Sequence, residues 1–140
     1  MRDVQRLVLA RQLQALEDTL QDLRSTVEGF ARIAALHDRQ VHAAANIIPD
    51  LKLPTGALRA CMPLPMPSIA ECIDGLKQIR LMYADELALK RAIVDQLTYD
   101  STAEDLAALQ ALFIAEPNIP AATVADVLSL VLVTIKEAKV

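Results

Sequence analysis

The side chains that could most readily bind a metal ion are two histidines, His37 and His42. They are five residues apart, and in a helix this spacing points them to different faces. A metal site needs His, Cys and carboxylate ligands that converge on one point. The sequence therefore gives no metal site here, and we expect no cofactor.

The nucleophiles are equally isolated. Cys61 and Cys72 lack metal-ligand spacing, and no serine or cysteine stands in a recognisable arrangement with a base. Gly56 stands alone in PTGAL, so no glycine-rich phosphate loop is present. We expect a non-enzymatic protein in a reducing intracellular compartment, with both thiols serving as small apolar side chains.

Glu86 and Lys90 form a pair four residues apart in the favourable order for a helix. They follow Tyr83, one of only two tyrosines in the chain. Two interpretations are open at this point. The three residues form either a solvated helix face or an edge that meets a partner protein.

A long helix must carry the first third of the sequence, because apolar residues recur there at alternating steps of four and three. This heptad pattern predicts one helix over about 3–45. Such a helix is longer than a compact domain of 140 residues needs, so we expect part of it to meet another helix or a second chain. The heptad seam consists of Leu9, Leu13, Leu16, Leu20, Leu23, Val27, Phe30, Ala34, His37 and Val41.

Five prolines between 49 and 67 forbid a continuous helix and predict a connector. Ser68 and Glu71 then form a capping-box signature for a second helix over about 68–99. Ser101 and Glu104 repeat that signature before a short alanine-rich helix. The expected fold is all-α: a long antiparallel, coiled-coil-like helical hairpin followed by two shorter helices. Its expected segments are 1–48, 49–67, 68–99 and 100–140.

The last helix, from Pro120 to about Lys136, is apolar around nearly its whole circumference. A helix of this kind is buried on most sides. It is either a core helix or a partner surface, and the pattern leaves both open. Its longest apolar run has about 12 residues, whereas a membrane span needs about 20, so we expect no membrane insertion.

Composition agrees with a helical protein-binding chain. Hydrophobic residues make up 54% of the sequence and aromatic residues only 3%, so the core depends on aliphatic side chains. The net charge of −4 gives no basic surface for nucleic acid, and we expect no direct nucleic-acid binding.

The second predicted helix also carries a motif. Met82-Tyr83, Glu86-Leu87 and Leu89-Lys90-Arg91 together resemble a helix near the C-terminus of the cyclin-dependent kinase 2-interacting protein family. In that family a leucine-rich helix and a proline-bearing connector come before this motif, and a turn with proline and a last leucine-rich helix follow it.

The resemblance implies a nuclear adaptor in cell-cycle control, DNA replication and damage checkpoints, and in maturation of the large ribosomal subunit. It implies a second small helical protein as partner and, through it, an AAA-ATPase or kinase complex. The alternative is a generic coiled-coil subunit of a tethering or kinetochore-type complex. The candidate partner-binding residues are Leu13, Leu16, Leu20, Leu23, Val27, Tyr83, Glu86, Lys90, Val127, Leu128, Val131 and Ile135.

Overall fold

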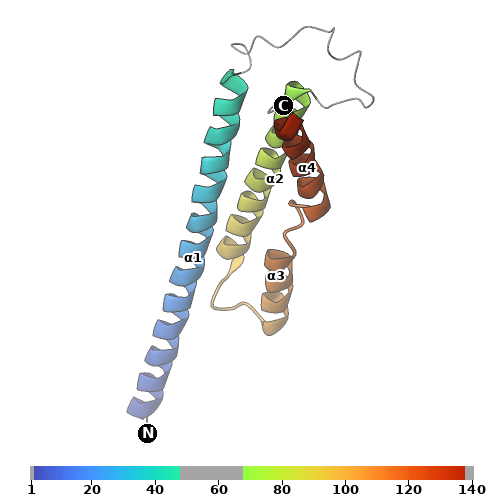
Figure 1. Cartoon of the computed structure of the whole chain (residues 1–140). Coiled ribbons are helices and arrows are strands. Elements are labelled where there is room, and N and C mark those ends of the chain that lie inside the picture. The colour runs from blue at the N-terminus through green and yellow to red at the C-terminus, as the bar shows by residue number, and fades with distance from the viewer. Residues whose placement is uncertain (1, 48–67, 138–140) are drawn as a thin grey trace, which may run out of the picture.

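The computed structural model describes residues 2–47 and 68–137, and within these ranges it contains four α-helices and no strand (Figure 1). The expectation of an all-α chain is confirmed. The proline-rich connector expected over 49–67, including Cys61, lies outside the described residues.

The first helix, α1 (Arg2–Ile47), has 46 residues, and the second, α2 (Ile69–Gln96), has 28. At 1.5 Å per residue they are about 69 and 42 Å long. The start of α2 follows the expected capping box, because Ser68 accepts from the Glu71 backbone N–H and the Glu71 carboxylate accepts from the Ser68 N–H. The two helices therefore differ in length by about 27 Å.

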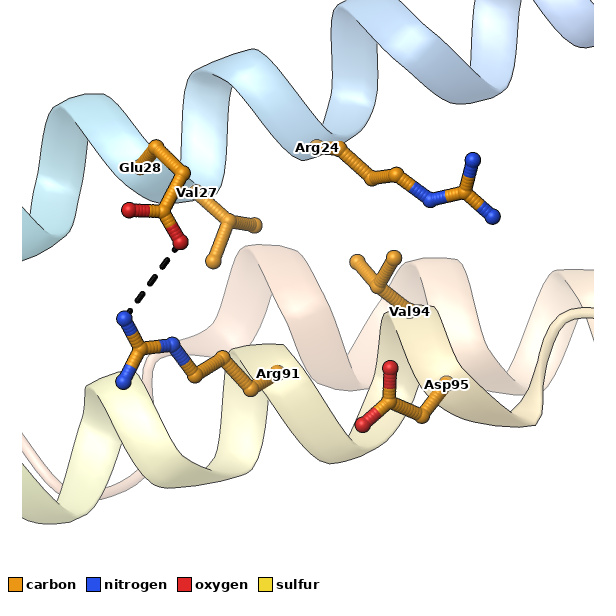
Figure 2. A pocket seen from close by; sticks show the side chains of 6 residues that line it. All are labelled: Arg24, Val27, Glu28, Arg91, Val94 and Asp95. Atoms are coloured by element: carbon orange, nitrogen blue, oxygen red, sulfur yellow. Dashed lines mark hydrogen bonds and ion pairs between the residues drawn. The ribbon is translucent and has the colours of Figure 1, made fainter.

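α1 and α2 run antiparallel along each other (Figure 1). The Arg80 guanidinium donates to Asp38 at 2.8 Å, and Arg91 of α2 is 3.4 Å from Glu28 of α1. Figure 2 shows the second contact beside Val27 and Val94, which are both buried where the helices meet. The paired part of α1 therefore begins near residue 20, opposite the end of α2.

Two short helices, α3 (Ala103–Ala115) and α4 (Ala121–Glu137), follow one another along α2 in the opposite direction to it (Figure 1). The α3 start differs by one residue from the expected cap. Thr102 is the N-cap and closes a capping box with Asp105. The Thr102 hydroxyl and backbone N–H both donate to the Asp105 carboxylate, and they hold the pKa of that carboxyl below its usual value. Ser101 instead closes a turn with Thr98, whose backbone N–H its hydroxyl accepts at 3.0 Å.

α2 lies between α1 and the α3–α4 pair, and the buried apolar residues of the described chain gather around it. They are Val27 and Val41 of α1 together with Cys72, Ile73, Ile79, Ile93 and Val94 of α2. None of the helices in the described ranges is long and apolar enough to cross a membrane.

Candidate partner-binding surface

Glu86 and Lys90 lie inside the molecule. The Glu86 side chain is 0% exposed and that of Lys90 is 5% exposed, and their charged groups are 3.3 Å apart. Both side chains are therefore shielded from water. A buried pair of opposite charges is tolerated only when further polar contacts replace the lost hydration.

The replacement contacts come from α3 and from the turn that follows it. The Lys90 ammonium donates to the Phe113 backbone carbonyl at 2.9 Å and lies 4.2 Å from the centre of the Phe113 ring. Glu86 accepts from the backbone N–H and from the side-chain amide of Asn118, both at 3.2 Å. Glu116 adds a second carboxylate 3.3 Å from Lys90. We call these five residues the polar latch.

The polar latch changes the interpretation of this part of α2. Neither a solvated face nor an accessible partner-binding edge fits Glu86 and Lys90, because the chain's own α3 and the α3–α4 turn cover them. Sequence reasoning missed Phe113, Glu116 and Asn118, which are more than 20 residues away along the chain. In the sequence, only the four-residue spacing of Glu86 and Lys90 on the second helix hinted at a special role.

Tyr83, the third residue of the expected edge, is half-buried against α1. Its ring stacks on Phe30 with the centroids 5.8 Å apart and the planes at 19°, and it lies 6.0 Å from the His37 ring. Stacked aromatic pairs of this kind add about 0.5–1.5 kcal/mol beyond simple burial. Tyr83 thus contributes to the contact between α1 and α2.

The heptad seam of α1 changes from exposed to buried along its length. Leu13 and Leu16 are 43% and 41% exposed, Leu20 and Leu23 are half-buried, and Val27 is 4% exposed. The change occurs where α2 ends. Val27 therefore packs within the chain, while Leu13 and Leu16 stay accessible.

Residues 3–19 of α1, which we call the N-terminal arm, project past the end of α2, and the outer part of the arm also projects past α3 (Figure 1). Every one of them is exposed. Where the arm joins the rest of the molecule, a cavity of about 370 Å³ opens between α1, the end of α2 and α3. Its apolar lining consists of Leu16, Leu20, Leu97, Tyr99 and Leu106.

The C-terminal candidates divide between two faces of α4. Val127 and Val131 are half-buried on the side towards α2, whereas Leu128 and Ile135 are 47% and 48% exposed. The close approach of α4 depends on Gly75, because a Cβ at that position would lie 2.8 Å from Val127 Cγ1. The helix that looked apolar all round therefore has a packed face and an open face.

The histidines lie apart from any metal-like cluster. In the described ranges no group of three or more His, Cys, Asp and Glu side chains could hold a metal ion. Asp38 instead accepts a hydrogen bond from Arg80, and this contact is the main reason that the pKa of Asp38 lies below its usual value. The charges of His42, Arg80 and His37 lower that pKa further.

These features define a small all-α protein whose longest helix extends beyond its own core. The family model "CA109-like: Ribosome biogenesis protein C1orf109-like" matches residues 1–135, so the chain belongs to this ribosome biogenesis family. No curated protein and no solved structure matches the chain significantly.

The family match corrects the assignment made from the motif. The resemblance of Met82–Arg91 to the cyclin-dependent kinase 2-interacting protein family is wrong as an identification, because the model that matches nearly the whole chain is that of another family. The structure gives a physical reason for weighing the motif less. In this chain Tyr83, Glu86 and Lys90 hold the protein's own helices together.

Proposed function

We propose that this chain is a non-enzymatic helical adaptor that binds another protein through its N-terminal arm and connects it to the particles in which ribosomes mature. The family match supports the ribosomal setting. The arm supports the binding role, and it is the observation that carries the proposal.

The arm is unusual because its apolar residues belong to a seam that is already used for helix pairing. Further along the same helix, this seam buries Val27 and Val41 to 4% exposure against α2. In the arm the seam continues through Leu9 and Leu13, which are 56% and 43% exposed, and Leu16 lines the open cavity beside Leu97 and Leu106. Heptad seams are stabilised when a second helix covers them. The arm therefore offers an edge for a helix from another protein.

The rest of the molecule is a scaffold of packed helices that holds the arm in place. The polar latch fixes α3 and the α3–α4 turn on α2, and α2 in turn holds α1 through cross-helix ion pairs. The buried charges are thus engaged in holding helices together, which suits an adaptor. The open face of α4, with Leu128 and Ile135, is a second candidate contact surface.

The proposed partner is a second small helical protein, and the proposed location is the nucleus or nucleolus, where ribosomes begin to mature. An AAA-ATPase assembly as the larger machine stays a prediction, which co-purification of the tagged chain with such an ATPase would test. The kinase, replication and checkpoint roles depended on the resemblance that the family match corrects, and the proposal leaves them out. The alternative of a tethering or kinetochore-type subunit gains no support from the family.

The experiment compares two variants of a tagged full-length chain expressed in cells. Leu9→Glu/Leu13→Glu places charges on the seam of the arm, and Ile33→Glu places one at a residue of α1 that is 59% exposed but off the seam. Pre-ribosomal particles are separated on sucrose gradients, and the tagged chain is measured in each fraction. We expect the double variant to leave the particles and Ile33→Glu to remain. Equal association of both variants would refute the proposal.

A further inference from the structure

The tip of the N-terminal arm has apolar side chains on more than one face. Val4, Leu7 and Val8 are 65%, 70% and 50% exposed, and at 100° per residue they lie roughly opposite Leu9 and Leu13 of the seam. One helix laid along the seam would leave these three residues in water. A protein that covers all the apolar side chains of the arm must therefore contact the tip on a second side as well.

An antiparallel second copy of the chain meets this requirement. If the two arms lie along each other in opposite directions, the tip of each arm reaches the place where the other arm joins its own core. That place contains the cavity lined by Leu97, Tyr99 and Leu106. Apolar residues of the tip thus meet an apolar wall that a single helix lacks.

The spacing of the seam and its charges selects the register. With Leu9 opposite Leu13 of the second copy, seam positions alternate as they do in antiparallel coiled coils. Arg6 then lies beside Glu17 of the second copy, and the two-fold symmetry makes this contact twice. A parallel pair would instead bring Arg6, three residues before Leu9 on the same seam, next to Arg6 of the second copy. Opposite charges favour the antiparallel arrangement.

We propose that two copies of this chain pair through residues 3–19 of α1, antiparallel and about a two-fold axis near Arg11, each tip docking at the end of the other copy's α2. The proposal rests on the proposed function, in which the arm is a binding surface: the second copy covers the seam in the free chain, and the helix of the other protein takes its place on the ribosomal particles. The overlap is about 25 Å long, or little more than two heptads. Docking of the tips therefore adds apolar contact to a coiled coil that is short on its own.

The test is sedimentation equilibrium of the purified full-length chain over a wide range of concentrations. We expect the mass to rise from that of one 15.3 kDa chain to that of two chains. Leu13→Glu should weaken the pairing by at least about tenfold, which corresponds to about 1.4 kcal/mol, and Ile33→Glu should leave it unchanged. A chain that stays monomeric at every concentration, or a dimer that Leu13→Glu leaves intact, would overturn the proposal.

A charge exchange tests the register. Arg6→Glu and Glu17→Arg should each weaken the dimer, and the two together should restore it, while circular dichroism verifies that each variant keeps its helix content. An Arg6→Glu/Glu17→Arg variant that pairs as weakly as the single variants would overturn the antiparallel register.

The proposed pairing and the proposed function can be refuted separately. If the chain is monomeric and its Leu9→Glu/Leu13→Glu variant leaves pre-ribosomal particles, the pairing alone is refuted. If the chain is a dimer and that variant stays on the particles, the adaptor role is refuted.

Discussion

Lys90→Met is the substitution that most sharply tests the role of the polar latch. Methionine has a similar length and keeps the apolar part of the side chain, so the change removes the charge with little loss of volume. In the substituted protein the Glu86 carboxylate, which is 0% exposed, loses its partner at 3.3 Å. The Phe113 carbonyl loses its hydrogen bond from Nζ at the same time.

The expected cost follows from these contacts. Removing one partner of a buried ion pair costs about 3–5 kcal/mol, because an uncompensated charge stays in the interior. Small domains are stable by only about 5–15 kcal/mol in total. Glu86→Gln should cost less, because a glutamine oxygen can still accept from Asn118 and Lys90 keeps Glu116 at 3.3 Å. The double variant should be less destabilised than the sum, since it leaves no buried charge unpaired.

Urea unfolding followed by circular dichroism gives the free energy of unfolding for each variant. The matched control is Lys77→Met, which removes a charge from the same helix. Lys77 pairs with Asp74 at 2.9 Å, but the two side chains are 49% and 71% exposed. Exposed pairs contribute about 0–1 kcal/mol, so the control should be nearly neutral. If Lys90→Met cost no more than Lys77→Met, the latch would not stabilise the fold.

Two further predictions concern glycines and acid pH. Gly75→Ala should destabilise the protein by about 1–3 kcal/mol, because the new Cβ would lie 2.8 Å from Val127 Cγ1. Gly29→Ala should stabilise α1 by about 0.5–1 kcal/mol, because the new Cβ would meet no neighbouring group within 4 Å. Both values come from urea unfolding, and the same sign for both changes would contradict the packing of α4. The pKa of Asp38 is lowered in the folded state, so the stability from its contact with Arg80 is present above the unfolded pKa and is lost as pH falls through the folded value. Asp38→Asn should flatten the decline in stability below about pH 4, and an unchanged acid profile would contradict this assignment.

The helices were predictable because their signals are local. The heptad seam predicts α1, and Ser68 with Glu71 marks the start of α2. The α3 cap was misplaced by one residue, since Ser101 and Thr102 are both good caps and only the turn with Thr98 decides between them. Which of two adjacent residues becomes the N-cap depends on the backbone geometry of the turn, and residue types alone do not show this geometry.

The site was less predictable because its contacts join distant segments. Nothing local to Glu86 and Lys90 shows that Asn118 and Phe113 will cover them, so a buried latch looked like an exposed edge. The accessible part of the seam depends on where α2 ends opposite α1, which neither helix shows alone. The candidates Leu13 and Leu16 were identified by the seam, but their exposure follows from the difference in helix length.

The central claim is that the N-terminal arm is where this chain contacts other proteins. The most direct measurement places the photo-crosslinker p-benzoylphenylalanine at Leu13 or at Ile33 of the tagged full-length chain, both of which are exposed on α1. After irradiation of pre-ribosomal particles, mass spectrometry identifies the protein joined to each position. The account predicts a defined crosslinked protein from position 13 and little from position 33. Crosslinks from position 33 alone, or equal crosslinking from both, would contradict it.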